Sequence, residues 1–594
     1  MKALFAPLLA LAAVHTALSA GARDPQQDLV AELEGAIEAP GWEDDRWGVM
    51  VVSLDAGDTL FARGAEEALV PASNLKLFTT AAALYFLRPD YRYSTYLTAT
   101  GPLRNGVVEG DLYVYGTGDP TLSDRFFEGK TAVWEALADS LAALGVRRIE
   151  GDIVGDASYF EGPAVGHGWE LTYVTHTYAA PASGLAFNDN IVTLRVTPGP
   201  DAGAPAEIQL IPGGGVDLRN EATTVASGRS HIEVERLAYD APIVVRGQVR
   251  SGSSALWRAV PVVDPARFAV SVFEPILEER GIEVVGTVRS VHDGARSPIT
   301  GSRVFAPTLD EDGVVQVLAV HRSPPLLEIL KVINQRSHNL YAESVLRTVG
   351  RVATGRGSVR GGRAAVAAIL EEAGADASTV FMDDGSGLST EDRASARSIV
   401  ELLAFMARSP YGDEYMETLP EAATSRGLRR MQQTDAAGNL RAKTGTIDRV
   451  SALSGYVTAR SGERLAFSII SNDVPSTWKA KRVEDRIGAR LAAFDRPLPR
   501  RVADAAGRGT DPDSASGART ARADSALRMA DATPADSPLP DAAPRPDYYT
   551  IKRGDTLEGI AREAGVSVGA LRAANPGVNA RRLIPGKRLK LPNT

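Results

Sequence analysis

The sequence contains no cysteine among its 594 residues. A chain without thiols has no disulfide framework, no cysteine nucleophile and no metal site built on cysteine ligands. Its seven histidines do not follow the spacings of metal-binding motifs. We therefore expect no metal site and no cofactor, and a chemistry carried out by other side chains.

An excess of charge of one sign is also missing. The chain carries 65 Lys+Arg and 74 Asp+Glu, a net charge of −9, and this balance does not favour nucleic acid as a partner. No apolar run after the N-terminus reaches the roughly 20 residues that a transmembrane helix needs, so we expect no stable membrane span. The length indicates several domains, and 44% hydrophobic residues are enough to fold them.

The N-terminus has the pattern of an export signal. Lys2 precedes a short apolar run from Ala3 to Val14, and small residues follow up to Ala22. Residues 1–22 are therefore predicted to be a signal peptide, which implies an exported, periplasmic or cell-wall associated protein. A buried first helix is the alternative.

Periodicity divides the rest of the chain into segments of different character. Helices and strands alternate over 23–92 and again over 305–495, which we assign to one discontinuous domain. Short β-rich runs separated by Gly, Pro and Asp fill 93–304, which we read as an inserted domain or pair of domains. Residues 496–546 have no aromatic residue and are rich in Ala, Asp, Pro, Ser and Arg, so they are predicted to form a disordered linker before a compact segment at 547–594. The elements expected in the discontinuous domain are a hairpin over 47–63, helices over 73–87, 326–349, 362–373, 395–406 and 477–494, and strands over 453–457 and 465–470.

The first motif whose side chains could carry out catalysis is Ser73-Asn74-Leu75-Lys76. If a helix starts at Ser73, the serine and the lysine lie one turn apart on the same face. The lysine can then act as the base for the serine, provided that burial or a second cation lowers its pKa from about 10.4. Alternatively, Ser73 only caps a helix. Ser476-Thr477-Trp478-Lys479 repeats the spacing, and there the capping role of Ser476 is favoured.

Two further motifs support a catalytic role. Ser337-His338-Asn339 and Lys443-Thr444-Gly445 follow in the order found in penicillin-binding proteins and serine β-lactamases. Taken singly, the first could be polar residues of a helical hairpin and the second a turn into a strand. Thr446 and two strand candidates follow the second motif, which predicts that residues 443–446 lie on a strand able to pair with an extended peptide.

The chain resembles the S13 group of low-molecular-mass penicillin-binding proteins, the D-alanyl-D-alanine carboxypeptidase/endopeptidases. The resemblance runs from about 40 to 497 and includes the long insertion between Lys76 and Ser337. It implies an α+β fold, a transpeptidase-like domain of the penicillin-binding/β-lactamase type that is split by a β-rich insertion. Besides the three motifs it rests on Gly110-Asp111-Leu112, Gly118-Asp119-Pro120-Thr121-Leu122, Gly151-Asp152-Ile153, Ala180-Pro181, Phe187-Asn188, Asn190, and Asp384-Gly385-Ser386-Gly387-Leu388-Ser389.

The resemblance also implies a role for each residue of the motifs. The nucleophile would be Ser73 and its base Lys76, while Ser337 relays a proton and Asn339 orients the substrate. The end of the substrate would be bound by Lys443, Thr444 and Thr446, with Gly445 allowing its backbone to approach, and the backbone N–H groups of Ser73 and Thr446 would form the oxyanion hole.

Two departures from the family pattern are visible. His338 stands where Asp or Asn is common, and we expect its side chain to point away from the reaction and to have a small effect. Leu171-Thr172-Tyr173 replaces an expected acidic stretch after Trp169-Glu170, which leaves open how the amino end of a peptide stem is recognised.

The compact segment at 547–594 resembles a LysM module, a small βααβ domain. It begins with Tyr549-Thr550-Ile551-Lys552 and a turn at Gly554-Asp555-Thr556-Leu557, and it continues through Asn575-Pro576 and Leu583-Ile584-Pro585-Gly586. A generic βααβ domain is the alternative. LysM modules bind glycans that contain N-acetylglucosamine, so both resemblances imply peptidoglycan, stem peptide and glycan, as the partner.

The sequence therefore predicts a serine-type D-Ala-D-Ala carboxypeptidase/endopeptidase that forms an acyl-enzyme on Ser73, is inhibited covalently by β-lactams and is tethered to the wall by LysM. A serine β-lactamase-like hydrolase and a non-catalytic peptidoglycan-binding protein are the alternatives. The complete set of motifs argues against the second, and the insertion argues against the first.

Overall fold

The computed structural model describes residues 24–43, 45–299, 316–424 and 427–497, together with 548–551, 560, 571, 574–575 and 588–590. The chain forms two compact units, Met1–Leu527 and Arg528–Thr594. The predicted signal peptide and all but the first two residues of the predicted linker lie outside the described residues. None of the described helices is both long and apolar enough to cross a membrane.

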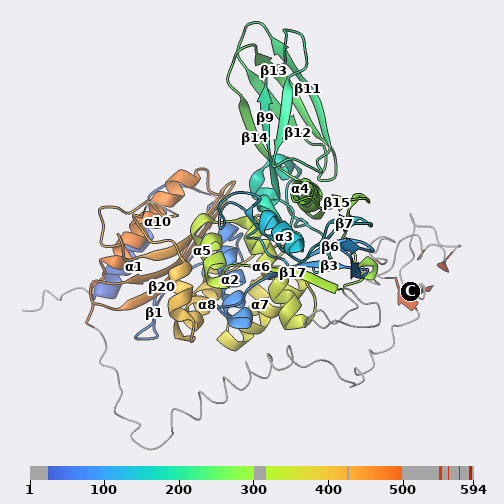
Figure 1. Cartoon of the computed structure of the whole chain (residues 1–594). Helices are drawn as coiled ribbons and strands as arrows, with labels where there is room; N and C mark the ends of the chain where they lie inside the picture. The colour runs from blue at the N-terminus through green and yellow to red at the C-terminus, as the bar shows by residue number, and fades with distance from the viewer. Residues whose placement is uncertain are drawn as a thin grey trace, which may run out of the picture. The chain divides into compact units, whose positions relative to one another are not determined.

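The discontinuous domain of the first unit contains a five-stranded antiparallel sheet in the order β18-β19-β20-β1-β2, of which β1 and β20 are labelled in Figure 1. Side chains on successive positions of a strand point to opposite faces, and β1 follows this rule. Val49 and Val51 face the core with α1 and α10, whereas Met50 faces the core with α2 and α8. The sheet is therefore covered by helices on both faces. The bounds are β1 Arg46–Ser53, β2 Thr59–Arg63, β18 Arg441–Ile447, β19 Val450–Thr458, β20 Arg464–Asn472, α1 Pro25–Glu38, α2 Lys76–Leu87, α8 Ala396–Arg408 and α10 Thr477–Ala492.

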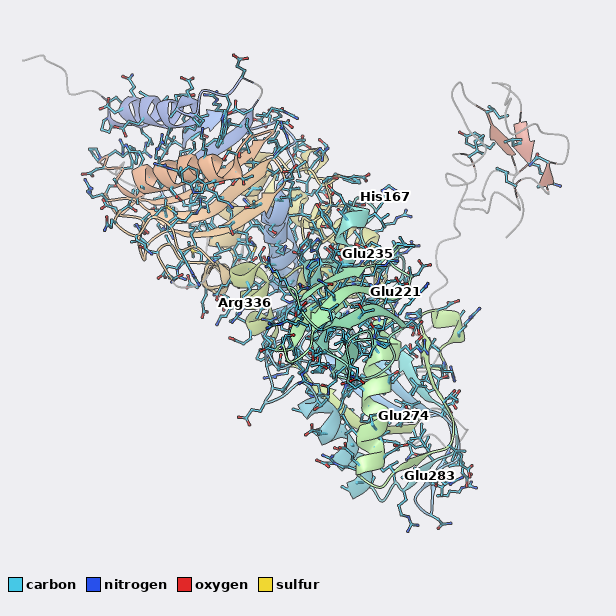
Figure 2. All side chains as sticks on the ribbon, turned by 90° about the horizontal axis from the view of Figure 1, so that it is seen from above. His167, Glu221, Glu235, Glu274, Glu283 and Arg336 are labelled. Carbon is cyan, nitrogen blue, oxygen red and sulfur yellow. The ribbon has the colours of Figure 1, made fainter. Side chains whose placement is uncertain are left out.

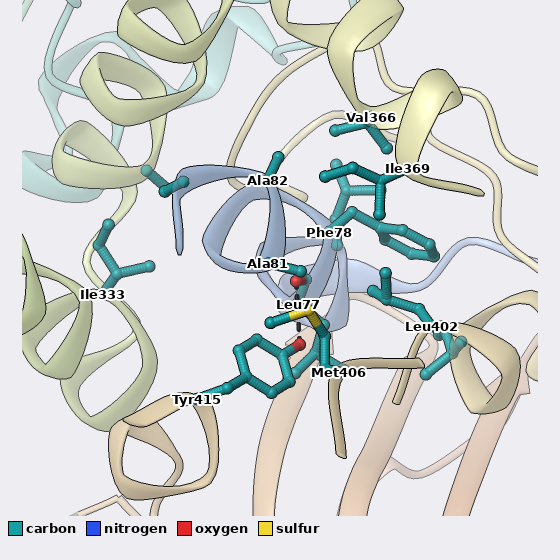
Figure 3. Close-up of a cluster of buried hydrophobic side chains, with 14 of the residues drawn as sticks. Leu77, Phe78, Ala81, Ala82, Ile333, Val366, Ile369, Leu402, Met406 and Tyr415 are labelled. Atoms are coloured by element: carbon teal, nitrogen blue, oxygen red, sulfur yellow. Dashed lines mark hydrogen bonds between the residues drawn. The ribbon is translucent and has the colours of Figure 1, made fainter. Parts of the chain in front are cut away.

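Helix α2 is buried on every side at its first three turns, as the cluster around it shows (Figure 3). Phe78 packs among apolar side chains that include Val366 and Ile369, and the hydroxyl of Tyr415 donates to the backbone oxygen of Leu77 at 3.0 Å. Close packing of this kind fixes a helix against its neighbours. The start of α2 is consequently a rigid platform. The surrounding helices are α5 Leu326–Arg336, α6 Asn339–Thr354, α7 Val359–Ala373 and α9 Gly412–Thr418.

The insertion contains two larger sheets and a projecting pair of three-stranded sheets (Figure 1). It also contains two helices, α3 and α4, whose Trp134 and Phe273 rings lie 5.3 Å apart, centroid to centroid, in a common core. The sheet orders are β16-β8-β6-β3-β17, β15-β7-β5-β4, β10-β9-β14 and β11-β13-β12. The bounds are β3 Ser94–Ala99, β4 Leu103–Arg104, β5 Val107–Val108, β6 Leu112–Gly116, β7 Arg148–Ile149, β8 Ile153–Asp156, β9 Ile191–Thr197, β10 Glu207–Ile211, β11 Leu218–Val225, β12 His231–Glu235, β13 Ile243–Arg250, β14 Leu256–Pro261, β15 Glu283–Val284, β16 Val288–Val291, β17 Gln316–Arg322, α3 Ala132–Ala143 and α4 Pro265–Glu279.

Strand β17 extends the inserted sheet beyond the expected end of the insertion at residue 304. It pairs antiparallel with β3, with Arg322 opposite Ser94. The chain thus leaves and re-enters the first domain through two adjacent strands. The predicted boundary falls before β17, because pairing between strands so far apart in the chain leaves no local pattern in the sequence.

Surface ion pairs join the projecting strands. Arg246 on β13 contacts Glu221 on β11 and Glu235 on β12, and both carboxylates lie on the projecting strands in Figure 2. Exposed pairs of this type each contribute about 1 kcal/mol or less. Their contribution to the stability of this sheet is therefore small.

The helical pattern predicted over 326–349 is interrupted. Ser337 adopts a left-handed conformation, with φ 54° and ψ 42°, and ends α5, while α6 begins at Asn339. Apolar periodicity continues across this break, which is why the sequence pattern does not reveal it.

The second unit is described only in part. Strands β21 Tyr548–Thr550 and β22 Arg588–Lys590 pair antiparallel. The side-chain oxygen of Asn575 accepts from the backbone N–H of Lys590 at 2.9 Å, and Ile551, Ile560 and Leu571 are buried. The two strands predicted at the ends of this segment are present, and its two predicted helices lie mostly outside the described residues.

Candidate active site

Ser73 lies in a short 3₁₀ turn, η1 Ala72–Leu75, and α2 begins at Lys76. The helix was expected to begin at Ser73, so its start is three residues later. The pairing of the two side chains is retained, because Nζ of Lys76 lies 3.0 Å from Oγ of Ser73. Ser73 is partly exposed whereas Lys76 is fully buried, so the serine faces the surface and the lysine lies beneath it.

The ammonium end of Lys76 is held by three oxygen atoms. It donates to Oγ of Ser73, to Oδ1 of Asn339 at 2.7 Å and to the backbone oxygen of Ser386 at 2.5 Å. The three acceptors come from η1, from the start of α6 and from the loop before α8. This cage fixes Nζ in position to take a proton from the Ser73 hydroxyl.

Burial lowers the pKa of Lys76 to about 8, against the opposing influence of the nearby carboxylates of Asp384, Glu343 and Asp392. At a pKa of about 8, neutrality at pH 7 costs only about 1.4 kcal/mol. An ordinary lysine would need roughly 4 to 5 kcal/mol. The site can therefore supply a neutral amine as general base without a histidine.

The Ser337-His338-Asn339 turn joins α5 to α6 and faces Ser73. Asn339 bridges two parts of the protein, since its Oδ1 accepts from Lys76 and its Nδ2 donates to the backbone oxygen of Tyr178 at 2.9 Å. Ser337 receives a hydrogen bond from Nζ of Lys443 at 3.0 Å. The turn at the left-handed residue Ser337 thus brings one side chain to Lys443 and the other to Lys76.

Lys443 approaches the same turn from β18. Its Nζ also donates to the backbone oxygen of Thr444 at 2.7 Å, and its side chain is fully buried. Burial, together with the charge of Lys76, holds the pKa of Lys443 well below its usual range. The charge of Lys76 thus favours the neutral form of Lys443.

Gly445 lets β18 lie directly against the Ser73 turn. A Cβ at this position would be 2.9 Å from the backbone oxygen of Pro71 and 3.2 Å from the backbone nitrogen of Ser73. Thr444 is partly exposed and Thr446 is exposed on the same strand. Because β18 is the edge strand of the sheet, the two threonines border a surface where an extended peptide can add as a further strand.

Asp384 is a structural residue of the site to which the sequence analysis assigned no role. It is fully buried and accepts hydrogen bonds from four successive backbone N–H groups, those of residues 386–389, and from the indole of Trp169 at 2.8 Å. This loop presents the backbone oxygen of Ser386 to Lys76. The Asp-Gly-Ser-Gly string was a signal for such a turn, since a buried carboxylate needs several donors.

The second S-x-x-K string has the structural role that was favoured for it. Ser476 caps α10, and its hydroxyl accepts from the backbone N–H of Lys479 at 3.4 Å. Lys479 is exposed. This pair therefore lacks the burial that distinguishes Lys76.

Comparison with known proteins decides the family. The D-Ala-D-Ala carboxypeptidase 3 (S13) profile matches residues 29–494, and a LysM profile matches residues 549–592. The chain belongs to the S13 family. Its C-terminal segment is a LysM domain, as predicted. Family membership favours the carboxypeptidase reading over the β-lactamase and non-catalytic alternatives.

Named relatives cover most of this S13 protein. It is 34% identical over 482 residues to the D-alanyl-D-alanine carboxypeptidase of Actinomadura sp. strain R39, spanning 79% of this chain and 85% of that protein. It is 26% identical over 405 residues to D-alanyl-D-alanine carboxypeptidase DacB of Haemophilus influenzae, spanning 67% and 79%. The crystal structure of penicillin binding protein 4 (dacB) from that organism superposes with a TM-score of 0.64 at 23% identity, covering 79% of this chain and 99% of the other. The predicted α+β, penicillin-binding fold is confirmed.

One cluster in the S13 domain has the composition of a metal site. Within the described ranges, ligand atoms of His167, Asp383 and Glu391 lie within 4.8 Å of one another. His167 and Glu391 are exposed, and His167 lies at the surface in Figure 2. Asp383 already accepts from the backbone N–H of Gly168 at 2.9 Å, and His167 pairs with Glu391 at 3.3 Å. These contacts explain the cluster as a surface polar network, and the absence of a metal stays a prediction.

Proposed function

We propose that this S13 protein is a D-alanyl-D-alanine carboxypeptidase or endopeptidase that cleaves peptidoglycan stem peptides through an acyl-enzyme on Ser73. The observation that carries this proposal is the position of a buried lysine of lowered pKa 3.0 Å from the Ser73 hydroxyl. A serine becomes an effective nucleophile when a neutral base of this kind takes its proton.

The reaction follows from the placement of the groups. Nζ of Lys76 takes the Ser73 proton while Oγ attacks the carbonyl carbon of the penultimate D-alanine. The C–N bond then breaks, and the departing amine receives a proton through Ser337, which Lys443 holds at 3.0 Å. Water hydrolyses the resulting ester and regenerates Ser73. Backbone N–H groups of Ser73 and Thr446 stabilise the oxyanion of each tetrahedral intermediate.

Lys443 recognises the terminal carboxylate of the substrate. In the free enzyme its pKa is lowered by burial and by Lys76. An arriving carboxylate favours the ammonium form of Lys443, so the bound pair is an ion pair. β-Lactams, which carry a carboxylate beside a strained amide, acylate Ser73 by the same route.

The LysM domain holds the enzyme at peptidoglycan by binding its glycan strands. The protein works at the cell wall after export, with residues 1–22 removed as a signal peptide. A basic tail supports attachment, because residues 547–594 carry 9 Lys+Arg and 4 Asp+Glu on a chain that is acidic elsewhere.

Release of D-alanine from an N-acylated peptide that ends in D-Ala-D-Ala tests the activity. Wild type and Ser476→Ala should release D-alanine at the same rate, since Ser476 only caps a helix. Ser73→Ala should release none above background. Equal release by Ser73→Ala and wild type would overturn the proposal.

A further inference from the structure

His338, the middle residue of the S-x-N turn, contacts the inserted domain. Its Nε2 lies 3.5 Å from Oδ2 of Asp189, and its ring centroid lies 4.2 Å from that of Tyr341. The side chain is only 19% exposed. The side chain of His338 therefore packs against Tyr341 and faces Asp189, and the small effect expected for it stays a prediction.

Asp189 is presented to His338 by an unusual backbone. It is the centre of η4 Asn188–Asn190, in which all three residues have positive φ, at 50°, 54° and 55°. Left-handed residues other than glycine persist where the surroundings hold them. Here Asn190 does so, because it accepts from the backbone N–H of Phe187 at 3.0 Å and donates to the backbone oxygen of Pro181 at 2.8 Å.

The charge of Asp189 is matched on several sides. Nη2 of Arg125 donates to it at 2.7 Å, and the hydroxyl of Tyr341 donates at 3.2 Å. Burial alone would raise the pKa of Asp189, but the contacts with His338 and Arg125 outweigh it and hold the pKa well below its usual range. Asp189 is consequently a permanent anion facing His338.

The segment of the insertion that contains Asp189 also contacts Asn339, the last residue of the S-x-N turn. Tyr178 precedes Asp189 by eleven residues in sequence, and its backbone oxygen accepts from Nδ2 of Asn339 at 2.9 Å. Two contacts from one inserted segment thus flank the turn. Between them, the backbone N–H of His338 donates to the oxygen of Ile333 at 3.2 Å.

We propose that His338 and Asp189 form a positioning pair, through which the inserted domain holds Ser337 and Asn339 in register with the two active-site lysines. This inference rests on the proposed function and names residues that act through others, without touching the substrate. Displacement of the turn by about 1 Å would lengthen both the Asn339–Lys76 and the Ser337–Lys443 hydrogen bonds. Misplacement on that scale can cost about 100-fold in rate.

Two substitutions of His338 distinguish the effect of its contact with Asp189 from the effect of its packing on Tyr341. His338→Gln keeps an amide nitrogen that can reach Asp189, whereas His338→Leu keeps only the packing on Tyr341. We expect His338→Leu to slow acylation by a labelled penicillin about tenfold, because the buried charge of Asp189 loses this contact, and His338→Gln to recover most of the rate. Because Asn339 stabilises the ammonium form of Lys76, its withdrawal in His338→Leu should also lower the pKa of Lys76 and move the acid limb of the pH profile to lower pH.

A double-mutant cycle tests whether Asp189 is the residue through which His338 acts. If the two side chains act through one contact, His338→Leu combined with Asp189→Asn should be no slower than the slower single variant. The matched control is His231→Leu, which removes an exposed histidine 3.0 Å from Glu233 on β12 and should leave acylation and its pH profile unchanged.

The outcomes separate this inference from the proposed function. Wild-type acylation rates and an unshifted acid limb in His338→Leu would overturn the pair, and so would equal losses in His338→Leu and His338→Gln, since those would reflect packing alone. Purely additive effects in the cycle would exclude Asp189 as the partner. A wild-type enzyme that is not acylated at all would instead overturn the proposed function, and this inference with it.

Discussion

Nζ of Lys76 and Oδ1 of Asn339 lie 2.7 Å apart, although 263 residues separate them in the chain. The hydrogen bond joins α2 to the start of α6 across the entire insertion. Because Lys76 is also bonded to Ser73 and to the backbone of Ser386, its amine cannot turn away without breaking several contacts. Lys76, the proposed general base, is thus held by elements from three separate parts of the sequence.

The acylation rate should depend on the protonation of Lys76. Its pKa is lowered to about 8 by burial, and only the neutral amine accepts the Ser73 proton. Below about pH 8 the rate should therefore fall, approaching about tenfold per pH unit. The second-order rate constant for a fluorescent penicillin, measured from pH 6 to pH 10, checks this. A rate constant that is flat between pH 6 and pH 8 would contradict Lys76 as the base.

Replacement of Lys443 tests the role of the second lysine. Lys443→Ala removes the cation that faces Ser337 and should reduce kcat/KM on a D-Ala-D-Ala peptide by about 100-fold or more, while Lys443→Arg keeps the charge without the compact geometry and should retain part of the activity. Lys479→Ala, at an exposed lysine, is the control and should match wild type. Unchanged activity in Lys443→Ala would mean that the K-T-G string is an ordinary strand.

A methyl group at Gly445 should harm the site more than the fold. Its Cβ would lie 2.9 Å from the oxygen of Pro71 and 3.2 Å from the nitrogen of Ser73, so β18 must move away from the serine. We expect Gly445→Ala to lower the acylation rate at least tenfold, with a melting temperature close to that of wild type. Gly35→Ala in α1 has no atom within 4 Å of the added Cβ and should leave acylation intact. Normal acylation in Gly445→Ala would show that close contact between β18 and the Ser73 turn is dispensable.

Much of the site could be predicted from the sequence because its motifs are local. Ser73 and Lys76 are three residues apart, and Lys443 to Thr446 are consecutive on one strand. Helices α2, α7, α8 and α10 were also foreseen, since apolar periodicity marks them, whereas α5 and α6 were expected as one helix and α9 was not predicted. The family resemblance supplied the relation between these distant motifs.

The features that were missed depend on contacts between distant residues. The break at Ser337 follows from a left-handed residue within a continuous apolar pattern. The role of Asp384 depends on a loop closing around one carboxylate, with Trp169 arriving from 215 residues away. The pairing of β17 with β3 spans the insertion. Apart from the Asp-Gly-Ser-Gly string at Asp384, the sequence contains no local trace of these contacts.

Truncation near residue 500 should weaken the action of the enzyme only on substrates that carry glycan. A chain ending near residue 500 lacks the LysM domain at 549–592 but keeps every residue of the candidate active site. Turnover of a small soluble peptide should be unchanged, whereas co-sedimentation with insoluble peptidoglycan and digestion of intact sacculi should weaken. Higher salt should weaken wild-type binding only partly, because sugar contacts are less screened than charges. Equal co-sedimentation of truncated and full-length protein would show that LysM adds no wall binding.

The identity of the acylated residue tests most directly whether Ser73 is the nucleophile. Full-length protein should be exposed to a penicillin, digested with trypsin and mapped by mass spectrometry, with Ser73→Ala as the control. We predict one adduct, on the peptide that contains Ser73, and none in Ser73→Ala. An adduct on the peptide containing Ser476, or undiminished labelling of Ser73→Ala, would contradict the account.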